Sequence, residues 1–434
     1  MRILRRMMGI YPSREIKVET KKLSIKQNML YNSVGFIVYL FCQWLITIVV
    51  VRLSNYEDAG ILSLAMSINN ILYAISTFGL RNYQVSDIEN KYSDYEYIIV
   101  RGVTCCFSTI CCFIFLLLNS THYSMNQMGC ILLYFIFKVT EALIDVIQGI
   151  QQKKYRMDYV GKSFVIRGIL TLSGFTIVFK VTSSLAASIA AMILLSASVA
   201  FFYDYVNCKK LTKLPSELEW SKVKAVIMEN MPLMFNELFM TGVVSVARYF
   251  LEFYEGNEVL GIYASIATPT VIIQAACNMI YSPLISEYAV HYNKKDYKAY
   301  KKLIVGVLEA FVLILALVLA GVFVLGDWGL QLLFGSEILE YSYLLSQTVL
   351  VTFLVAFMYW LSALMVVARK QKSVMLINGA AIILVIIFSV QMIPQMGING
   401  INYALFATFA VDIVLLAVLA FRTVRENFAA DTSK

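Results

Sequence analysis

Apolar segments long enough to cross a lipid bilayer recur along the whole chain, and they limit its fold more than any single motif. Twelve such runs, each near the roughly 20 residues of helix that a hydrocarbon core requires, lie between Leu30 and Phe421. Soluble domains are roughly 45–50% apolar and about 25% charged, whereas this chain of 434 residues is 59% hydrophobic and 15% charged. Because backbone groups in lipid must bond within their own segment, the sequence predicts an all-α integral membrane protein.

The predicted spans form two sets of six. The first set is Leu30 to Val51, Ala59 to Leu80, Ile98 to Leu118, Met128 to Ile150, Phe164 to Val181 and Leu185 to Val206. The second set is Val226 to Phe250, Leu260 to Ser286, Leu303 to Leu325, Ser342 to Val367, Val374 to Met392 and Ile401 to Phe421. We therefore expect a basic segment 1–29, a six-helix bundle 30–206, a cytoplasmic linker 207–225, a second bundle 226–421 and a tail 422–434.

Basic residues gather in alternate loops and so orient the chain. Short cytoplasmic loops retain Lys and Arg, and exported loops do not. The segment before the first span and the loops near Tyr155, Pro215 and Asn293 are basic, whereas those near His122 and Gly256 are bare or acidic. The sequence predicts that both termini are cytoplasmic, in a bacterial inner membrane. This bias also accounts for the net charge of +8, so no nucleic-acid partner is expected.

The two halves share short sequence landmarks at a constant separation. Three dipeptides recur 201 or 202 residues apart: Asn28-Met29 with Asn230-Met231, Gly60-Ile61 with Gly261-Ile262, and Asp94-Tyr95 with Asp296-Tyr297. Six spans in each half would start both halves on the same side of the membrane. The pattern predicts a parallel repeat with a substrate path between the bundles.

Ionisable residues inside the predicted spans are candidates for function, because charge at bilayer depth is costly. On the fourth span, Lys138, Glu141 and Asp145 lie within about 60° of one another around the helix. Lys138 either neutralises the two carboxylates within its own helix, or this face lines an aqueous path, which we favour. The seventh span contributes Asn236, Glu237 and Arg248, although Arg248 is also placed to reach the membrane interface.

Other polar and proline residues leave more than one interpretation open. Glu309 and Asp412 are isolated acids, suited either to carry a coupling ion or to support helix packing. Pro269 and Pro283 predict bends in the eighth span. The eight Cys show no CxxC spacing and the chain has two His, so we expect no metal site and no bound cofactor.

Three groups of residues, which together cover both halves, carry a family resemblance by their order and spacing along the twelve spans. The first comprises Glu57-Asp58-Ala59-Gly60-Ile61, Phe78-Gly79-Leu80-Arg81 and Gln84-Val85-Ser86-Asp87. The second comprises Gly149-Ile150-Gln151-Gln152, Arg156-Met157-Asp158, Ser163 and Arg167-Gly168. The third comprises Arg248-Tyr249-Phe250-Leu251-Glu252, Gly261-Ile262-Tyr263-Ala264 and Asp296-Tyr297. Together they resemble the polysaccharide repeat-unit (Wzx-type) flippases of the multidrug/oligosaccharidyl-lipid/polysaccharide (MOP) exporter superfamily.

The resemblance implies a fold, a substrate and a set of roles. It implies a V-shaped alternating-access transporter, not an enzyme, that moves an undecaprenyl-diphosphate-linked oligosaccharide while the lipid tail stays among membrane lipids. Glycosyltransferases and a glycan polymerase would be its partners, and H⁺ or Na⁺ would drive it. A cationic lumen is implied, with Lys138, Arg248, Glu237, Asn236 and Arg81 as candidates to meet substrate. The coupling-ion candidates are Glu141, Asp145, Glu309 and Asp412.

Three other functions compete with this interpretation. A cation-coupled multidrug exporter would use the same fold, but it favours a lumen of acids and aromatic residues. A membrane glycan polymerase or acyltransferase would need catalytic residues in a sizeable outer loop, whereas His122 and His291 fall in short loops on opposite sides. A scaffold that recruits glycosyltransferases would tolerate neutralisation of its buried charges.

Overall fold

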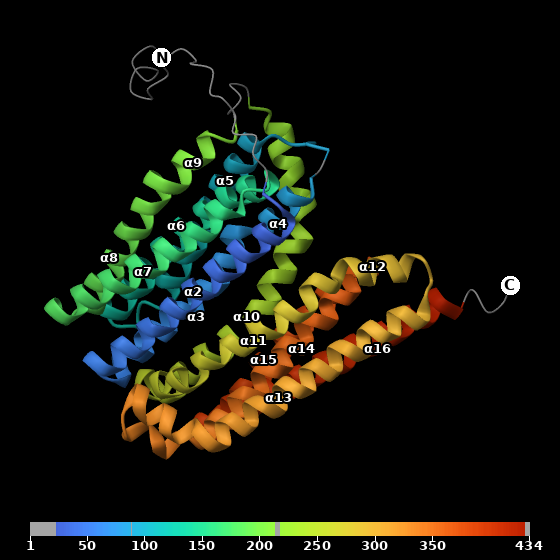
Figure 1. The fold of residues 1–434 in the computed structure, drawn as a ribbon. Helices are drawn as coiled ribbons and strands as arrows, with labels where there is room; N and C mark the ends of the chain where they lie inside the picture. Colours follow the sequence, from blue (N-terminus) through green and yellow to red (C-terminus); the bar gives the residue numbers. More distant parts are fainter. Residues whose placement is uncertain (1–22, 88, 213–217, 430–434) are drawn as a thin grey trace, which may run out of the picture.

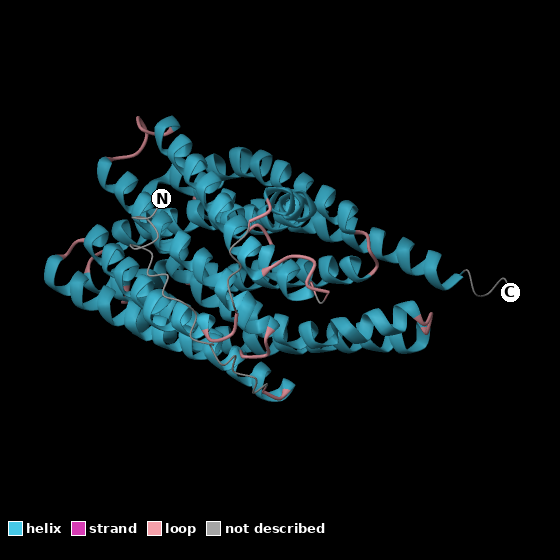
Figure 2. Cartoon of the chain, turned by 90° about the horizontal axis from the view of Figure 1, so that it is seen from above, coloured by secondary structure: helices cyan, strands magenta, loops and turns pink. Residues whose placement is uncertain are grey.

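The computed structural model describes residues 23–429 except 88 and 213–217, and these residues form helices joined by short loops with no strand (Figure 2). The first half contains α2 (Ile25–Leu53), α3 (Tyr56–Thr77), α4 (Leu80–Ser86), α5 (Asp94–Leu118), α6 (Met125–Lys153), α7 (Met157–Thr182), α8 (Leu185–Val199), the π-helix η1 (Ala200–Tyr205) and α9 (Val206–Lys209). The basic residues predicted before position 23, and Pro215 in the predicted linker, lie outside the described residues.

A long helix, α10 (Trp220–Ala267), leads into the second half. It is followed by η2 (Thr268–Thr270), α11 (Val271–Tyr281), η3 (Ser282–Leu284), α12 (Ile285–Asn293), α13 (Tyr297–Phe334), η4 (Glu337–Tyr341), α14 (Tyr343–Val367), α15 (Gln371–Met396) and α16 (Ile398–Ala429). The short 3-10 turns η2 and η3 contain Pro269 and Pro283. The α-helix thus gives way to a 3-10 turn at each proline, where the sequence predicted bends, since proline removes a helix hydrogen bond.

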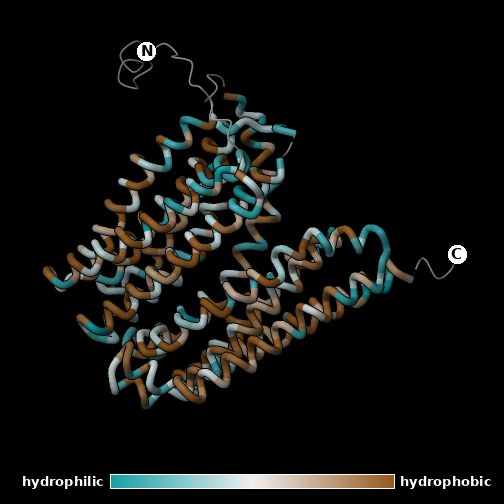
Figure 3. The backbone as a smooth tube through the Cα atoms, viewed as in Figure 1, coloured by the Kyte–Doolittle hydropathy of each residue, from teal (hydrophilic) through white to brown (hydrophobic). Residues whose placement is uncertain are grey.

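The helices account for the twelve predicted spans. Ten helical segments of the described chain are long and apolar enough to cross a membrane, and one of them, Trp220–Asn293, is 74 residues long. It breaks at Gly256, where φ is 85° and ψ is 178°, and so makes two crossings. Helix α6, 29 residues long, is absent from the ten because its charged face lowers its hydropathy. The second crossing of Trp220–Asn293 and the crossing of α6 bring the ten to twelve. Apolar residues line the middle of the helices and polar residues lie toward their ends (Figure 3).

Several helix ends differ from the predicted span ends. The second span was expected to continue to Leu80, but the chain leaves the helix at Phe78 and Gly79, where φ is 57° and 61°, and α4 restarts beyond them. Helix α13 extends past both ends of the predicted Leu303 to Leu325, because a helix can continue into the polar headgroup region. The sixth span loosens into the π-helix η1 before it ends.

The two halves form a V whose arms meet at one end (Figure 1). Helix α10 runs between them and packs along α3. At the end where α3 begins, the backbones touch so closely that a Cβ on Gly60 would lie 1.8 Å from the carbonyl oxygen of Asn257. A Cβ on Gly261 would lie 1.8 Å from that of Tyr56. We call this the joined end, defined by Tyr56–Gly60 and Asn257–Gly261. The other, open end carries the last residues of α9 and α12.

A second set of contacts closes the joined end through a side chain. Arg52, at the end of α2, donates from Nε to the carbonyl oxygen of Leu333 at 2.8 Å and from Nη2 to those of Leu332 at 2.5 Å and Gln331 at 3.2 Å. The last carbonyls of a helix lack internal partners and carry partial negative charge. Arg52 therefore caps α13 of the opposite half and ties the two arms together.

Candidate functional site: buried charges in the first half

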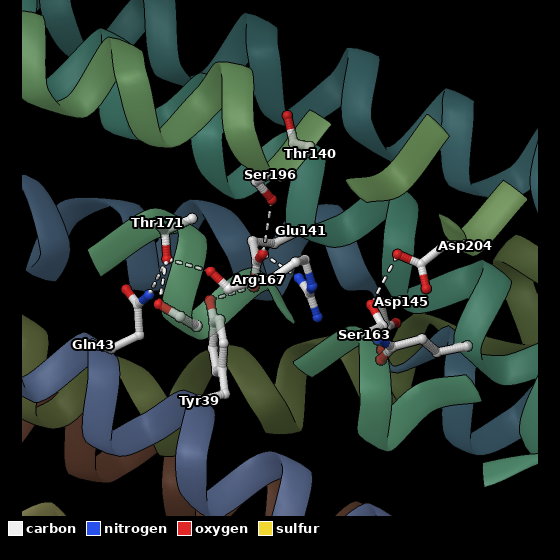
Figure 4. A network of polar contacts seen from close by, with 12 residues as sticks. Tyr39, Gln43, Thr140, Glu141, Asp145, Ser163, Arg167, Thr171, Ser196 and Asp204 are labelled. Carbon is white, nitrogen blue, oxygen red and sulfur yellow. Dashed lines mark hydrogen bonds and ion pairs between the residues drawn. The ribbon is translucent and has the colours of Figure 1, made fainter. Parts of the chain in front are cut away.

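Glu141 on α6 is the centre of a buried polar network (Figure 4). Its Oε1 accepts a hydrogen bond from Nη1 of Arg167 on α7, and its Oε2 accepts one from the Tyr39 hydroxyl on α2 at 2.7 Å. The Ser196 hydroxyl on α8 lies 3.3 Å from Oε1. The Glu141 side chain is 8% exposed. Four helices therefore converge on one carboxylate, whose charge is balanced by a guanidinium within the same half.

Asp145, one turn farther along α6, is held by two arginines. Nη2 of Arg101 lies 2.7 Å from Oδ2, and Nη1 of Arg81 lies 3.3 Å from Oδ1. Arg101 is fully buried and also donates to the carbonyl oxygen of Ser76 at 2.6 Å. Arg81 in addition donates from Nε to the side-chain oxygen of Gln152 at 3.0 Å. This cluster fixes α4 and α5 against α6.

Lys138 has no carboxylate partner among the described residues. Its ammonium nitrogen lies 5.1 Å from the ring centroid of Tyr73, 5.7 Å from that of Tyr134 and 5.9 Å from that of Phe137. Aromatic faces attract a cation without neutralising it. Because Glu141 and Asp145 are occupied by arginines, the geometry does not match the alternative in which Lys138 neutralises them within its helix.

The candidates on α10 occupy two levels of that helix. The Asn236 side-chain oxygen accepts from Nδ2 of Asn378 on α15 at 3.0 Å. Glu237 lies beside α4, since a Cβ on Gly79 would be 3.7 Å from its Oε1. Nε of Arg248 is buried without a hydrogen bond to any described residue. Arg248 is thus a second cation with no ion pair in the part of the chain that the structure describes.

The last two candidates lie apart from this site. Glu309 is exposed on α13, in a groove with Lys298, Lys301 and Lys302. Asp412 on α16 is 1% exposed, and its Oδ1 has no hydrogen-bond partner among the described residues. Helix α16 packs mainly on α14 and α15. The structure therefore brings together Arg81, Glu141 and Asp145 near Lys138, and leaves Glu309 and Asp412 outside.

Three charged residues of the network were not among the predicted site residues. Arg101, Arg167 and Asp204 all fall inside predicted spans, so the rule that flagged Lys138 applies equally to them. Asp204 lies on the π-helix η1, is fully buried, and accepts a hydrogen bond from the Ser163 hydroxyl at 2.9 Å (Figure 4). π-Helical turns are rare and often mark functional sites. A complete scan of each span for ionisable residues would have found all three.

Solved structures show where this fold belongs. An inward-facing multidrug resistance MATE family transporter of the MOP superfamily has a TM-score of 0.67 at 11% identity, covering 95% of this chain and 100% of that one. The MATE multidrug transporter DinF-BH in complex with R6G has a TM-score of 0.67 at 14% identity, covering 94% and 99%. A MOP superfamily transporter from Pyrococcus furiosus, described as having a binding pocket of reverse polarity, has a TM-score of 0.60 at 13% identity, covering 96% and 99%.

Sequence comparison gives the family. The capsular polysaccharide biosynthesis protein CapF of Staphylococcus aureus is 26% identical over 396 residues, which cover 86% of this chain and 93% of CapF. A family described as polysaccharide biosynthesis protein matches residues 25–289. The predicted V-shaped transporter fold and the predicted link to polysaccharide biosynthesis are thereby confirmed: the chain belongs to the polysaccharide biosynthesis protein family and is a multi-pass membrane protein.

Proposed function

We propose that this chain is a flippase that moves undecaprenyl-diphosphate-linked oligosaccharide repeat units across the cytoplasmic membrane for surface polysaccharide assembly, coupled to H⁺ or Na⁺. The family supports a role in polysaccharide production. The observation that carries the substrate class is Lys138, a cation that contacts three aromatic rings and has no carboxylate partner among the described residues. A diphosphate is well matched to a Lys or Arg in a low-dielectric cavity.

The charge balance of the first half supports an anionic substrate. Glu141 and Asp145 are bound by Arg167, Arg101 and Arg81. The ion pairs of both carboxylates are therefore with arginines and not with Lys138. A multidrug exporter for cations would instead present acids with free oxygens to its lumen. A glycan polymerase or acyltransferase is also disfavoured, since His122 lies near the joined end and His291 lies on α12 toward the open end.

The shape of the molecule supports loading from the cytoplasm. The arms meet at the joined end and diverge toward the end that bears Lys153, Lys209 and Asn293 (Figure 1). The positive-inside rule assigns that open end to the cytoplasm. Single cysteines introduced in a Cys-free background test this assignment. An impermeant thiol reagent added to intact cells should label position 120 and leave position 154 unlabelled; the reverse pattern would refute the orientation.

The proposed function is tested by following the lipid-linked sugar. In a deletion strain with intact glycosyltransferases, completed lipid-linked units should accumulate and remain protected from an impermeant glycosidase added to spheroplasts. Restoring the gene should make them accessible to it and return polysaccharide to the surface. If the deletion strain instead contained no completed unit, the chain would act in synthesis, as an enzyme or a scaffold. Completed units that reach the outer face without it would exclude a role in translocation.

A further inference from the structure

Glu252 on α10 is a buried carboxylate that contacts the opposite half at the joined end. It is 5% exposed and lies four residues before the break at Gly256. Nε2 of Gln127 on α6 donates to its Oε1 at 3.4 Å. Nε2 of His122, in the loop between α5 and α6, lies 3.9 Å from its Oε2. One carboxylate of the second half is therefore held by two side chains of the first.

This carboxylate is incompletely satisfied. The buried hydroxyl of Tyr123 interacts with this carboxylate, but neither that hydroxyl nor Glu252 Oε2 has a well-aligned hydrogen bond to a described residue. Burial, and then the Glu252 charge, raise the pKa of Tyr123, so this hydroxyl keeps its proton. Leaving an ionised carboxylate buried with an unpaired oxygen is costly. Binding a proton at Oε2 removes that cost.

We propose that Glu252 is the proton-binding residue that controls opening of the joined end during transport. The role of this residue in transport rests on the proposed function. The effect of its protonation on the joined end can be tested without any substrate. The groups facing Glu252 are His122, Tyr123 and Gln127 from the first half and Tyr249 from its own helix. In the charged form, Glu252 accepts a charge-assisted hydrogen bond from Gln127 of the first half. The neutral form accepts a weaker one, and the arms are free to part.

The position of Glu252 distinguishes it from the other acids. Glu141 and Asp145 are bound by arginines of their own half, so their charge does not connect the two arms. Asp412 is buried within the second half, and Glu309 is exposed. The His122 side chain is 37% exposed, which gives a proton a short route from solution to Oε2. A Na⁺ ion is a poorer occupant, because hard cations prefer oxygen ligands and the His122 side chain offers only nitrogen.

Distance measurements between spin labels at Thr121 and Gln331, one in each half, test the proposal in lipid nanodiscs without any substrate. The wild type should shift from a short to a long distance as the pH falls from mildly alkaline to mildly acidic. Glu252→Gln should show the long distance throughout, with the ratio of open to closed molecules at alkaline pH raised about tenfold, as expected for one charged hydrogen bond. Glu258→Gln, on the same helix and exposed, is the matched control and should follow the wild type.

Three results would overturn the proposal. The first is a wild-type pH response in Glu252→Gln, the second is no pH response in the wild type, and the third is a distance that changes when Na⁺ is replaced by choline at fixed pH. If Glu252→Gln does not fold, Glu252→Asp is measured instead. It keeps the carboxylate, and the pH at which half of the molecules show the long distance should differ from that of the wild type. An unmoved midpoint would count against Glu252. Because no substrate is present, failure of the flippase assignment leaves this test intact.

Discussion

Lys138 lies 5.1 Å from the ring centroid of Tyr73, and this contact takes the place of an ion pair. The carboxylate nearest along its helix, Glu141, is occupied by Arg167. A lysine at this depth costs roughly 2.5–3.5 kcal/mol on insertion scales. A desolvated cation–π contact returns about 2 kcal/mol or more, and three rings lie within reach of the ammonium group. These contacts stabilise Lys138 without neutralising it, so its charge is available to an anionic ligand.

Lys138→Ala should abolish surface polysaccharide while the protein inserts at normal abundance, because no carboxylate is left unpaired by the change. Lys138→Arg should retain part of the activity, since it keeps the charge but alters the geometry. Immunoblots of membranes and quantification of surface glycan measure both effects. A fully active Lys138→Ala variant would remove Lys138 from the substrate path. Combining it with Glu141→Ala and Asp145→Ala is a poor control, because that change strands Arg167, Arg101 and Arg81.

Glu141→Ala should destabilise the protein itself. It leaves the buried guanidinium of Arg167 uncompensated, which costs about 3–5 kcal/mol, and it removes the partner of the Tyr39 hydroxyl. The double change Glu141→Leu with Arg167→Met should recover most of the loss, since it removes both charges and keeps the volume. Thermal unfolding in detergent, followed by size-exclusion chromatography, measures this. Glu309→Gln, at an exposed position, is the control. If Glu141→Ala and Glu309→Gln lowered the melting temperature equally, the ion pair of Glu141 would not be the cause.

Gly60→Ala should prevent close approach of the arms at the joined end. The new methyl group would lie 1.8 Å from the Asn257 carbonyl oxygen, and backbone atoms cannot move aside as a flexible side chain can. Gly102→Ala is the matched control, because nothing lies within 4 Å of its added Cβ. The distance between spin labels at Thr121 and Gln331 reports closure. The population with the short distance should fall sharply for Gly60→Ala and remain as in the wild type for Gly102→Ala.

Asp87, between α4 and α5, should contribute stability that depends on pH. Burial acts to raise its pKa, but the backbone N–H groups of Lys91 at 2.9 Å and Tyr92 at 3.2 Å, the Tyr97 hydroxyl and Lys153 together hold that pKa below its usual value. Because the pKa of Asp87 is lower in the folded protein, its charge stabilises the fold at any pH above the pKa of an unfolded aspartate, about 3.9. This contribution disappears as the pH falls through the pKa of Asp87 in the folded protein.

Asp87→Asn should therefore lower the free energy of unfolding at neutral pH by about 1.5–3 kcal/mol, the value of a hydrogen bond to a charged group, and the difference from the wild type should shrink in acid. Melting temperatures in detergent across that pH range measure it. Glu89→Gln, two residues away and exposed, should change neither the stability nor its pH dependence. A deficit for Asp87→Asn that stayed constant into acid would assign its effect to packing.

Much of the architecture follows from the length of apolar segments, because each helix in lipid must satisfy its own backbone. The spans, the bends at Pro269 and Pro283 and the buried location of Asp412 are local properties, visible in sequence. The break at Gly256 was placed correctly between two spans, but the continuous helical turns on either side of it were not expected. Helix ends were missed where polar residues extend a helix into the headgroup region.

The partners of the buried charges could not be predicted. Asp145 pairs with an arginine 44 residues away and Glu141 with one 26 residues away, and both depend on which helices become neighbours. Lateral packing in a membrane is not set by hydrophobicity, since lipid is as apolar as leucine. The 3.6-residue period of the helix identifies the face that carries Lys138. It does not predict that arginines on other helices form ion pairs with Glu141 and Asp145.

The contact at the joined end has a consequence for the history of the chain. Gly60 meets Asn257 and Gly261 meets Tyr56, and each of these contacts becomes the other when every residue is exchanged for its counterpart 201 positions away. Such reciprocity is the signature of a twofold axis, in which one patch is complementary to itself. A single six-span polypeptide bearing this patch would have dimerised through it before any gene fusion. The two arms of this chain meet through that self-complementary patch, whereas Lys138 and Glu252 have no counterpart of the same residue type 201 positions away.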